Sequence, residues 1–141
     1  MGTLKAMKNL AAVFLLFLAI SCSSKTSPVP MASFTIPTSS PQDVSAVWNK
    51  VRASLLTNGY AFSNDKGQDS KLFVLKSDQD AKVIISKNSD KGFVEVVFFH
   101  YKKSGFGAEE ERTFGNLKAA VQQAVNDHAV VDSVPFRRGR N

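Results

Sequence analysis

Residues 93–101 read FVEVVFFHY, and this stretch decides the fold. β-Branched and aromatic residues dominate it, and turn residues lie on both sides, which is typical of a β-strand. Side chains alternate along a strand, so its residues fall into two sets. One face presents Phe93, Glu95, Val97, Phe99 and Tyr101, and the other presents Val94, Val96, Phe98 and His100. Both faces are largely apolar, whereas a half-solvated antiparallel strand is polar on one face.

This apolar character has a functional consequence. Helices can cover one face of the sheet, so we expect the other face to meet a partner, the N-terminal tether, an apolar ligand or a second copy. We assign the candidate partner-binding sheet face to Val94, Val96, Phe98 and His100. The alternative is a strongly curled sheet that buries both faces within the domain.

Three shorter strand patterns precede the long one, at 60–62, 72–75 and 82–86. Clusters of Asn, Asp, Ser, Lys and Gly separate them, and such clusters form turns. The spacing of strands and turns predicts an antiparallel meander of four strands.

A helix is predicted before the strands, over 41–57. Ser40 can cap it, Pro41 suits the first helical position, and apolar residues recur at helical spacing from Val44 onward. The pair Asn58-Gly59 is a stop signal.

A second helix is predicted after the strands, over 113–128. Apolar residues recur at helical spacing from Phe114 to Val125, and Thr113 is a plausible cap. The acidic run 109–111 precedes it, near the positive end of the helix dipole.

The order α-β-β-β-β-α predicts the α+β class. We expect a two-layer sandwich, in which two helices flank a four-stranded antiparallel sheet. The domain covers 42–128, and 129–141 is expected to be a loose basic tail. Residues 22–41 form a Ser/Pro-rich tether, in which Phe34 and Ile36 can pack onto the domain edge as a short extended segment.

Residues 1–21 have the parts of an export signal peptide. Lys5 and Lys8 precede an unbroken apolar run, Leu10–Ile20, of 11 residues. As a helix this run is too short to cross a hydrocarbon core of ~30 Å, and its length and flanks match a secretory signal. The alternative is a buried core helix, which the Ser/Pro-rich stretch after it disfavours.

The end of this run, Leu18-Ala19-Ile20-Ser21-Cys22, resembles the lipobox of bacterial lipoproteins. Ser21 fits the small residue before the acceptor cysteine, while Ala19 departs from the usual Leu. The resemblance implies that Cys22 is lipidated through its sulfur and becomes the acylated N-terminus of the mature protein. The alternative is ordinary cleavage near Ser21, with Cys22 left as a spare thiol.

The same resemblance predicts where the protein lives. Ser23, rather than Asp, follows Cys22, and this implies the outer membrane if the source is Gram-negative. The domain would then face the periplasm; in other bacteria the anchor would lie in the cell membrane. Several acyl chains on one residue hold firmly, because each buried CH₂ contributes roughly 0.8 kcal/mol.

The formal net charge of +6 does not indicate nucleic acid. Much of the excess lies in the signal, the tether and the tail, while 42–128 holds 12 basic and 11 acidic residues. Nucleic-acid binding needs a basic face that neutralises several phosphates, so we expect no nucleic-acid partner. The basic tail 137–140 can touch anionic lipid, although solvation is its simpler role.

Catalytic and metal-binding patterns are thin, so we expect no enzyme, no metal and no cofactor. His100 and His128 lack the spacing of a zinc site, and both are interpreted as structural. Ser104 lacks the glycines of a nucleophile elbow. Gly105 and Gly107 do not make a phosphate loop, and the turn aspartates do not follow an EF-hand pattern.

A second resemblance concerns the mature domain. Residues 48–51 (WNKV), Leu55-Leu56, Gly59-Tyr60 and the Asp65–Gly67 turn resemble the start of a helix-grip domain. Such domains occur in a small lipoprotein component of the outer-membrane barrel-assembly machinery. The resemblance implies a small envelope accessory protein without a catalytic site.

The sequence therefore predicts a membrane-anchored envelope lipoprotein. Its small non-enzymatic domain would bind a protein partner in envelope assembly or secretion. One alternative is a carrier of an apolar ligand or lipid. The other is a hydrolase of cell wall or lipid with an unrecognised site.

Overall fold

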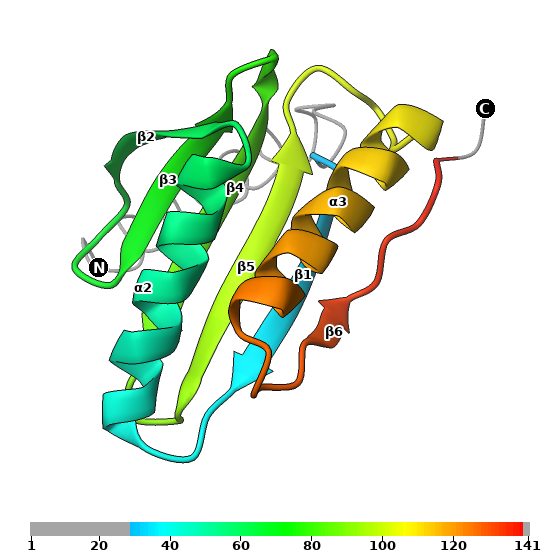
Figure 1. Cartoon of the computed structure of the whole chain (residues 1–141). Helices are drawn as coiled ribbons and strands as arrows, with labels where there is room; N and C mark the ends of the chain where they lie inside the picture. The colour runs from blue at the N-terminus through cyan, green and yellow to red at the C-terminus, as the bar shows by residue number, and fades with distance from the viewer. Residues whose placement is uncertain (1–28, 140–141) are drawn as a thin grey trace, which may run out of the picture.

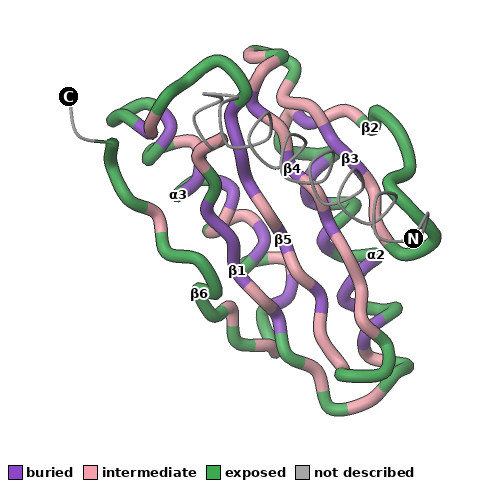
Figure 2. Tube along the Cα trace, turned by 180° about the vertical axis from the view of Figure 1, so that it is seen from behind, coloured by how far each residue is buried: buried purple, intermediate pink, exposed green. Residues whose placement is uncertain are grey.

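A computed structural model describes residues 29–139 of the chain. The signal peptide and Cys22 lie outside this range. The described chain is α+β: a six-stranded antiparallel sheet in the order β2-β3-β4-β5-β1-β6, with two helices on one of its faces (Figure 1). Seen from the opposite side, the sheet lies in front and the helices lie behind it (Figure 2). The predicted class and the two helices are therefore confirmed, while the prediction of four strands is too low.

The order of elements differs from the prediction at both ends, because a strand precedes the first helix and another strand follows the second. The elements, in chain order, are β1 (Met31–Pro37), α2 (Pro41–Thr57), β2 (Tyr60–Asp65), β3 (Ser70–Leu75), β4 (Asp78–Asn88), β5 (Phe93–His100), α3 (Ala108–Ala124) and β6 (Val131–Val134). The meander is confirmed, because β2, β3, β4 and β5 pair in chain order and antiparallel. The longest strand is β4, with 11 residues, and not β5, with 8.

β1 lies where the tether was expected. Its side chains alternate between a buried apolar set, Ala32, Phe34 and Ile36, and a set that includes Ser and Thr on the other face. It pairs antiparallel with β5 and inserts between β5 and β6, so it is an inner strand of the sheet. The expected tether therefore reaches only to about Pro30, and the domain begins at β1.

The C-terminal tail is not loose as far as Gly139. β6 pairs antiparallel with β1, and the Ser33 and Ser133 hydroxyls lie 2.8 Å apart. Phe136 then packs on the core, stacked against Phe106 with ring centroids 4.7 Å apart and against Phe114 at 5.7 Å. The prediction for 129–141 missed these contacts because the aromatic anchor stands alone among exposed residues.

α2 begins and ends as predicted. The Ser40 side chain accepts a hydrogen bond from the backbone N–H of Asp43 at 3.3 Å, and Pro41 occupies the first turn. At the other end Asn58 donates its backbone N–H to the carbonyl oxygens of Ser54 and Leu55. Gly59 follows with φ of +88°, a left-handed conformation that glycine adopts without strain, and the chain turns into β2.

α3 begins at Ala108 rather than at 113, and its cap is Gly107. The Glu110 carboxylate accepts a hydrogen bond from the backbone N–H of Gly107 at 3.0 Å. Thr113 instead donates its hydroxyl to the Glu109 carbonyl inside the helix. The acidic run therefore lies within the first turn, where the helix dipole favours negative charge.

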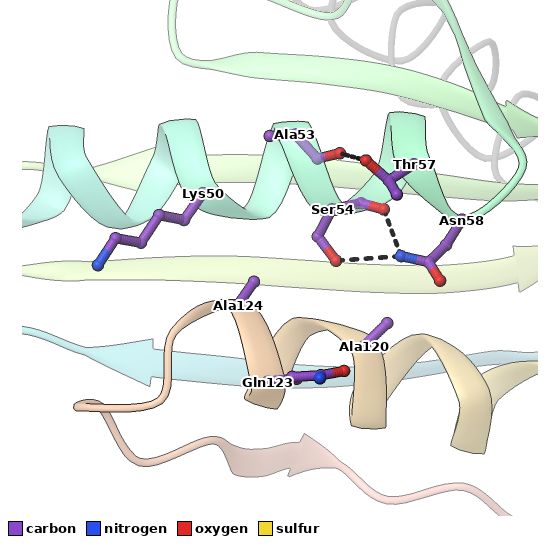
Figure 3. A pocket seen from close by; sticks show the side chains of 8 residues that line it. All are labelled: Lys50, Ala53, Ser54, Thr57, Asn58, Ala120, Gln123 and Ala124. Carbon is purple, nitrogen blue, oxygen red and sulfur yellow. Dashed lines mark hydrogen bonds between the residues drawn. The ribbon is translucent and has the colours of Figure 1, made fainter.

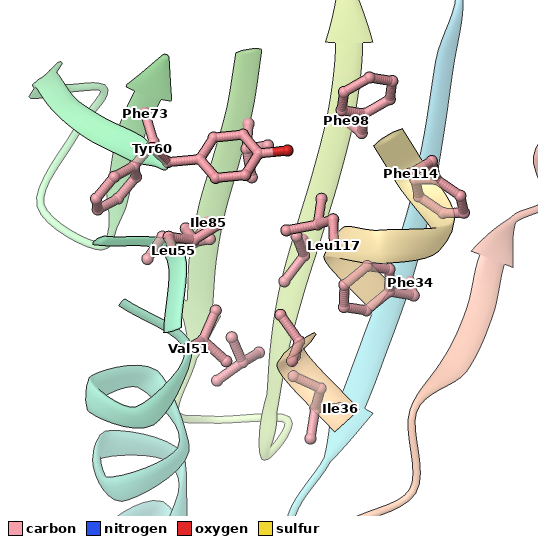
Figure 4. Packing of buried hydrophobic residues seen from close by; sticks show 14 of the residues in the cluster. Phe34, Ile36, Val51, Leu55, Tyr60, Phe73, Ile85, Phe98, Phe114 and Leu117 are labelled. Atoms are coloured by element: carbon pink, nitrogen blue, oxygen red, sulfur yellow. The ribbon is translucent and has the colours of Figure 1, made fainter. Parts of the chain in front are cut away.

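The hydrophobic core fills the space between the two helices and the sheet (Figure 4). Phe34 from β1, Phe98 from β5 and Phe114 from α3 meet there, with centroids 5.9 Å apart for Phe34–Phe114 and 6.0 Å for Phe98–Phe114. Fully burying one such side chain stabilises the fold by roughly 1.5–3 kcal/mol. This packing fixes both helices on one face and leaves the other face to be considered as a site.

Candidate functional site

The residues assigned to the partner-binding face lie in the core. Val94, Val96 and Phe98 are 0% exposed and His100 is 3% exposed. The first three belong to the core cluster beneath α2 and α3. The assignment to a binding face was therefore wrong. Alternation defines which residues share a face, but both sets of β5 are apolar, so the sequence did not reveal which set the helices cover.

The sheet face opposite the helices, called the outer face below, carries the other set of β5. The strand register places Val97 opposite Ile84 of β4, and Ile84 opposite Leu72 of β3. In the next row Phe99 lies opposite Met31 of β1. These five side chains, from four adjacent strands, form an apolar band across the outer face. Leu72 and Phe99 are buried, Ile84 and Val97 are half-buried, and Met31 is exposed.

The half of the outer face beyond the band is polar, apart from the half-buried Phe93 at the start of β5. Glu95 of β5 lies between Thr35 of β1 and Ser86 of β4. Ser86 pairs with Ser70 of β3, and their hydroxyls are 2.8 Å apart. The outer face therefore divides into an apolar half and a polar half along the strands.

An exposed aromatic residue, Tyr101, and a half-buried cation, Lys82, border the apolar band. Tyr101 is 54% exposed and lies edge-on to Phe99, with ring centroids 5.2 Å apart. The Lys82 ammonium lies over the Tyr101 ring, 4.7 Å from its centroid. Such a cation–π contact at an exposed position contributes about 0.5–1 kcal/mol. An aromatic and a cation thus stand at the edge of the band.

The band lies where the chain enters the domain. Met31 is the first residue of β1 and belongs to the band. Residues 23–30 separate it from Cys22, and even a fully extended chain of this length spans only about 30 Å. Any attachment at Cys22 therefore holds Met31, the edge of the band at the chain entry, within that distance.

His100 is held by two structural hydrogen bonds. Its Nε2 lies 2.8 Å from the Asp78 carboxylate, and its Nδ1 accepts from the backbone N–H of Lys102 at 3.3 Å. The hydrogen bond from His100, ahead of all other causes, lowers the pKa of Asp78. Both ring nitrogens are engaged, so His100 ties the end of β5 to the start of β4.

His128 lies just beyond α3. Its backbone carbonyl accepts a hydrogen bond from the Gln122 side chain at 3.0 Å. Its Nδ1 is buried and has no hydrogen-bond partner among the described residues. The two histidines come from opposite ends of the fold and do not form a common site.

The glycines at 105 and 107 have structural roles. A Cβ on Gly105 would lie 2.8 Å from the Cα of Gly139, so only glycine lets the C-terminal segment cross this loop. Gly139 donates its backbone N–H to the Phe106 carbonyl, and Arg138 forms an ion pair with Glu111. This loop therefore anchors the C-terminal segment onto α3.

Sequence reasoning missed a groove between the two helices. It is lined by α2 from Lys50 onward, by α3, and by Tyr60 from β2. Its wall residues are small or polar, and they resemble the ordinary solvent-facing residues of amphipathic helices. No periodic pattern would have found it, because it depends on how α2 and α3 lie relative to each other.

Within residues 29–139, no three His, Cys, Asp or Glu side chains gather closely enough to hold a metal ion. Neither described helix is both long enough and apolar enough to cross a membrane.

Comparison with known proteins adds no relative. No protein-family model matches the chain, and no curated protein is detectably similar to it. The lipoprotein and helix-grip resemblances therefore rest on the quoted residues alone. The function has to be inferred from the chain's own side chains, and above all from the apolar band of the outer face.

Proposed function

We propose that this chain is a lipid-anchored lipoprotein of the bacterial envelope, and that its domain binds a protein partner through the apolar band of the outer face. It acts as a non-enzymatic accessory factor in envelope assembly or secretion. The observation that carries the proposal is the band itself: five apolar side chains from four strands gather on the face that bears neither described helix.

The composition of the outer face suits a protein contact. Protein interfaces have an apolar centre with a polar rim, and aromatic residues are enriched in them. Val97 and Ile84 occupy the centre of the band, while Tyr101 and Lys82 stand at its edge. The polar half around Glu95 limits the apolar area, so the partner is expected to cover part of the face.

The anchor places this contact near a membrane. If Cys22 is acylated, the short segment 23–30 keeps Met31, at one end of the band, within about 30 Å of the lipid surface. A partner that is itself embedded in or bound to that membrane lies within this reach. The lipid anchor and the apolar band therefore both support a protein partner that lies in or on that membrane.

The anchor is tested by metabolic labelling with palmitate in the native bacterium. The wild-type chain should carry the label and sediment with membranes, and Cys22→Ala should lose both properties. Label that persists in Cys22→Ala would overturn the lipid attachment at this residue. Fractionation by density then separates the outer from the inner membrane.

The binding face is tested by site-specific photocrosslinking in cells. A photoreactive residue at Ile84 should join the chain to one envelope protein, identified by mass spectrometry. The same residue at Ser86, on the polar half, is the matched control and should give a much weaker product. Adding Val97→Asp should abolish the Ile84 product while thermal unfolding stays cooperative. Equal products from Ile84 and Ser86, or an Ile84 product that survives Val97→Asp, would contradict the proposed face.

The alternatives have less support. A lipid carrier with its ligand between helices and sheet needs free space there, but the packed cluster around Phe34, Phe98 and Phe114 occupies it. A hydrolase needs a base with a free nitrogen or oxygen beside a nucleophile. Both ring nitrogens of His100 are engaged by Asp78 and Lys102, and the Nδ1 of His128, which has no partner among the described residues, is buried.

A further inference from the structure

The groove between α2 and α3 has two adjoining parts, of which Figure 3 shows the shallower one. The deeper part has a volume of about 540 Å³ and lies over Tyr60, Leu75 and Leu117. A shallower part of about 370 Å³ continues between the helices, where Ala53 and Ala120 form the walls. Asn58, Ala120 and Gln123 line both parts. Small-ligand sites occupy about 300–1,000 Å³, so either part is large enough.

The floor of the deeper part is formed by Tyr60, whose hydroxyl opens onto the groove. Tyr60 is 3% exposed, and its hydroxyl makes no hydrogen bond to any described residue. Figure 4 shows its ring extending from β2 across the sheet, with the oxygen at the end nearer α3. Burial raises the pKa of Tyr60 to about 12, so the group is a neutral donor at physiological pH. The ring is buried while its hydroxyl lines the groove, so the hydroxyl is available to a ligand there.

The lining around this hydroxyl is polar but uncharged. The side chains that border the deeper part with hydrogen-bonding groups are Asn58, Ser77, Thr113, Asn116 and Gln123. The amide nitrogen of Asn58 is bound to the Ser54 carbonyl at 2.7 Å, and its carbonyl oxygen lies on the side of α3 (Figure 3). Among the residues lining either part, only Lys50 is charged, and it belongs to the shallow part.

These properties discriminate between ligand classes. A lipid chain is disfavoured by the amide and hydroxyl groups, and an anion finds only Lys50, at the far end. An extended peptide is recognised mainly by backbone pairing, but the walls are helices whose backbone groups bond internally. A ligand with many hydroxyl and amide groups can use Asn and Gln, which both donate and accept.

We propose that the groove between α2 and α3 binds a neutral saccharide, with the Tyr60 hydroxyl donating to it from the floor and the amides of Asn116 and Gln123 pairing with it at the rim. Leu75 and Leu117 contact the apolar face of a sugar ring. This site lies on the opposite side of the molecule from the apolar band. The proposal does not depend on the anchor or on a protein partner.

The proposal is tested by titrating the isotopically labelled chain, in detergent, with the β1,4-linked disaccharide of N-acetylglucosamine while NMR spectra are recorded. Saturable shifts are expected at Tyr60 and at the side-chain amides of Asn58, Asn116 and Gln123. Tyr60→Phe removes only the hydroxyl and should weaken binding about tenfold, the equivalent of one hydrogen bond. It should not lower the melting temperature, because the lost hydroxyl has no partner in the described fold. Tyr101→Phe, on the outer face, is the matched control and should leave the affinity unchanged.

A second variant and a second probe make the test decisive. Ala120→Leu places a larger side chain in the groove wall, and it should abolish the shifts while unfolding stays cooperative. The proposal is overturned if the disaccharide gives no saturable shifts at millimolar concentration. It is also overturned if Tyr60→Phe binds as well as the wild type, or if tetra-alanine shifts the groove residues and the disaccharide does not.

Discussion

The two faces of the sheet are built from the same strands but differ in what surrounds them. On the helix-covered face, Val94, Val96 and Phe98 are fully buried against side chains of α2 and α3. On the outer face, Phe93 and Val97 are half-buried and share their strand with Glu95. Apart from His100 at the end of β5, the first face is apolar, whereas the second is apolar in one half and mainly polar in the other.

This difference teaches what each face is for. A uniformly apolar face stabilises the fold, because every side chain on it has neighbours above and below. A face divided into an apolar and a polar half is typical of an interaction surface with a rim. Substitutions on the first face should therefore change stability, and substitutions on the second should change binding.

The largest expected effect compares two phenylalanines of β5 on opposite faces. Phe98→Ala should lower the free energy of unfolding by about 3–5 kcal/mol, because it opens a cavity in the core. Phe93→Ala, on the outer face, should cost only about 1 kcal/mol, because the ring is already partly exposed. Urea denaturation measures both. Equal losses would mean that the sheet buries its two faces alike, and the division between stability and binding would fail.

A smaller effect concerns a polar group on the helix-covered side. Asp78→Ala removes the carboxylate that pairs with the buried Nε2 of His100, so an unsatisfied donor remains. We expect a loss of about 1–3 kcal/mol in the free energy of unfolding. Asp80→Ala is the control, because the Asp80 carboxylate meets the exposed Lys102 ammonium at 3.7 Å and such a pair contributes about 0–1 kcal/mol. If the two variants unfold at the same urea concentration, the hydrogen bond between His100 and Asp78 does not contribute measurably to the free energy of unfolding.

A third effect concerns the edge of the helix-covered face. Phe136→Ala removes the ring that stacks on Phe106 and Phe114, and should lower the free energy of unfolding by about 1–2 kcal/mol. Val134→Ala, in the exposed strand β6, should change it by no more than about 0.5 kcal/mol. Thermal unfolding of the two variants compares them. A loss at Val134 as large as that at Phe136 would place the main anchor of this segment in β6.

The sequence predicted best what local signals determine. α2 was placed correctly from Ser40 to Gly59, because a cap, a proline and a left-handed glycine each act within a few residues. β1 was predicted only as a short extended segment around Phe34 and Ile36 at the domain edge, and not as an inner strand, because its composition resembles a linker. β6 has no such pattern, since all four of its residues are exposed.

The site could be predicted only in part. An apolar sheet face was expected, and the outer face has an apolar half, but Val94 and Phe98 were placed on it in error. Which face the helices cover is a tertiary property. The groove over Tyr60 was not predicted at all, because it arises from the packing of α2 beside α3.

The smallest expected effect concerns the helix that covers the first face. Glu110 lies in the first turn of α3, is 5% exposed, and its carboxylate lies 3.2 Å from the Lys103 ammonium. Burial raises the pKa of its carboxyl, but hydrogen bonds from the backbone N–H groups of Glu110 and Gly107, together with Lys103, outweigh burial and lower it. The native pKa thus lies below the unfolded value of about 4.3. A carboxyl group whose pKa is lower in the folded state than in the unfolded state stabilises the fold. This stabilisation is complete at pH values above the unfolded-state pKa, and it is lost as the pH falls through the folded-state pKa.

Glu110→Gln should therefore cost about 1 kcal/mol at pH 7, the usual value of a capping group. The difference in unfolding free energy between the variant and the wild type should stay constant from pH 7 to about pH 5 and shrink at lower pH. Urea denaturation across this range measures it. Lys103→Met removes one of the groups that lower the pKa of Glu110. The difference in unfolding free energy between this variant and the wild type should therefore also shrink at low pH, but by less. A difference that persists undiminished well below the unfolded pKa would show that the shape of the Glu110 side chain, and not its charge, holds the start of α3 over the sheet.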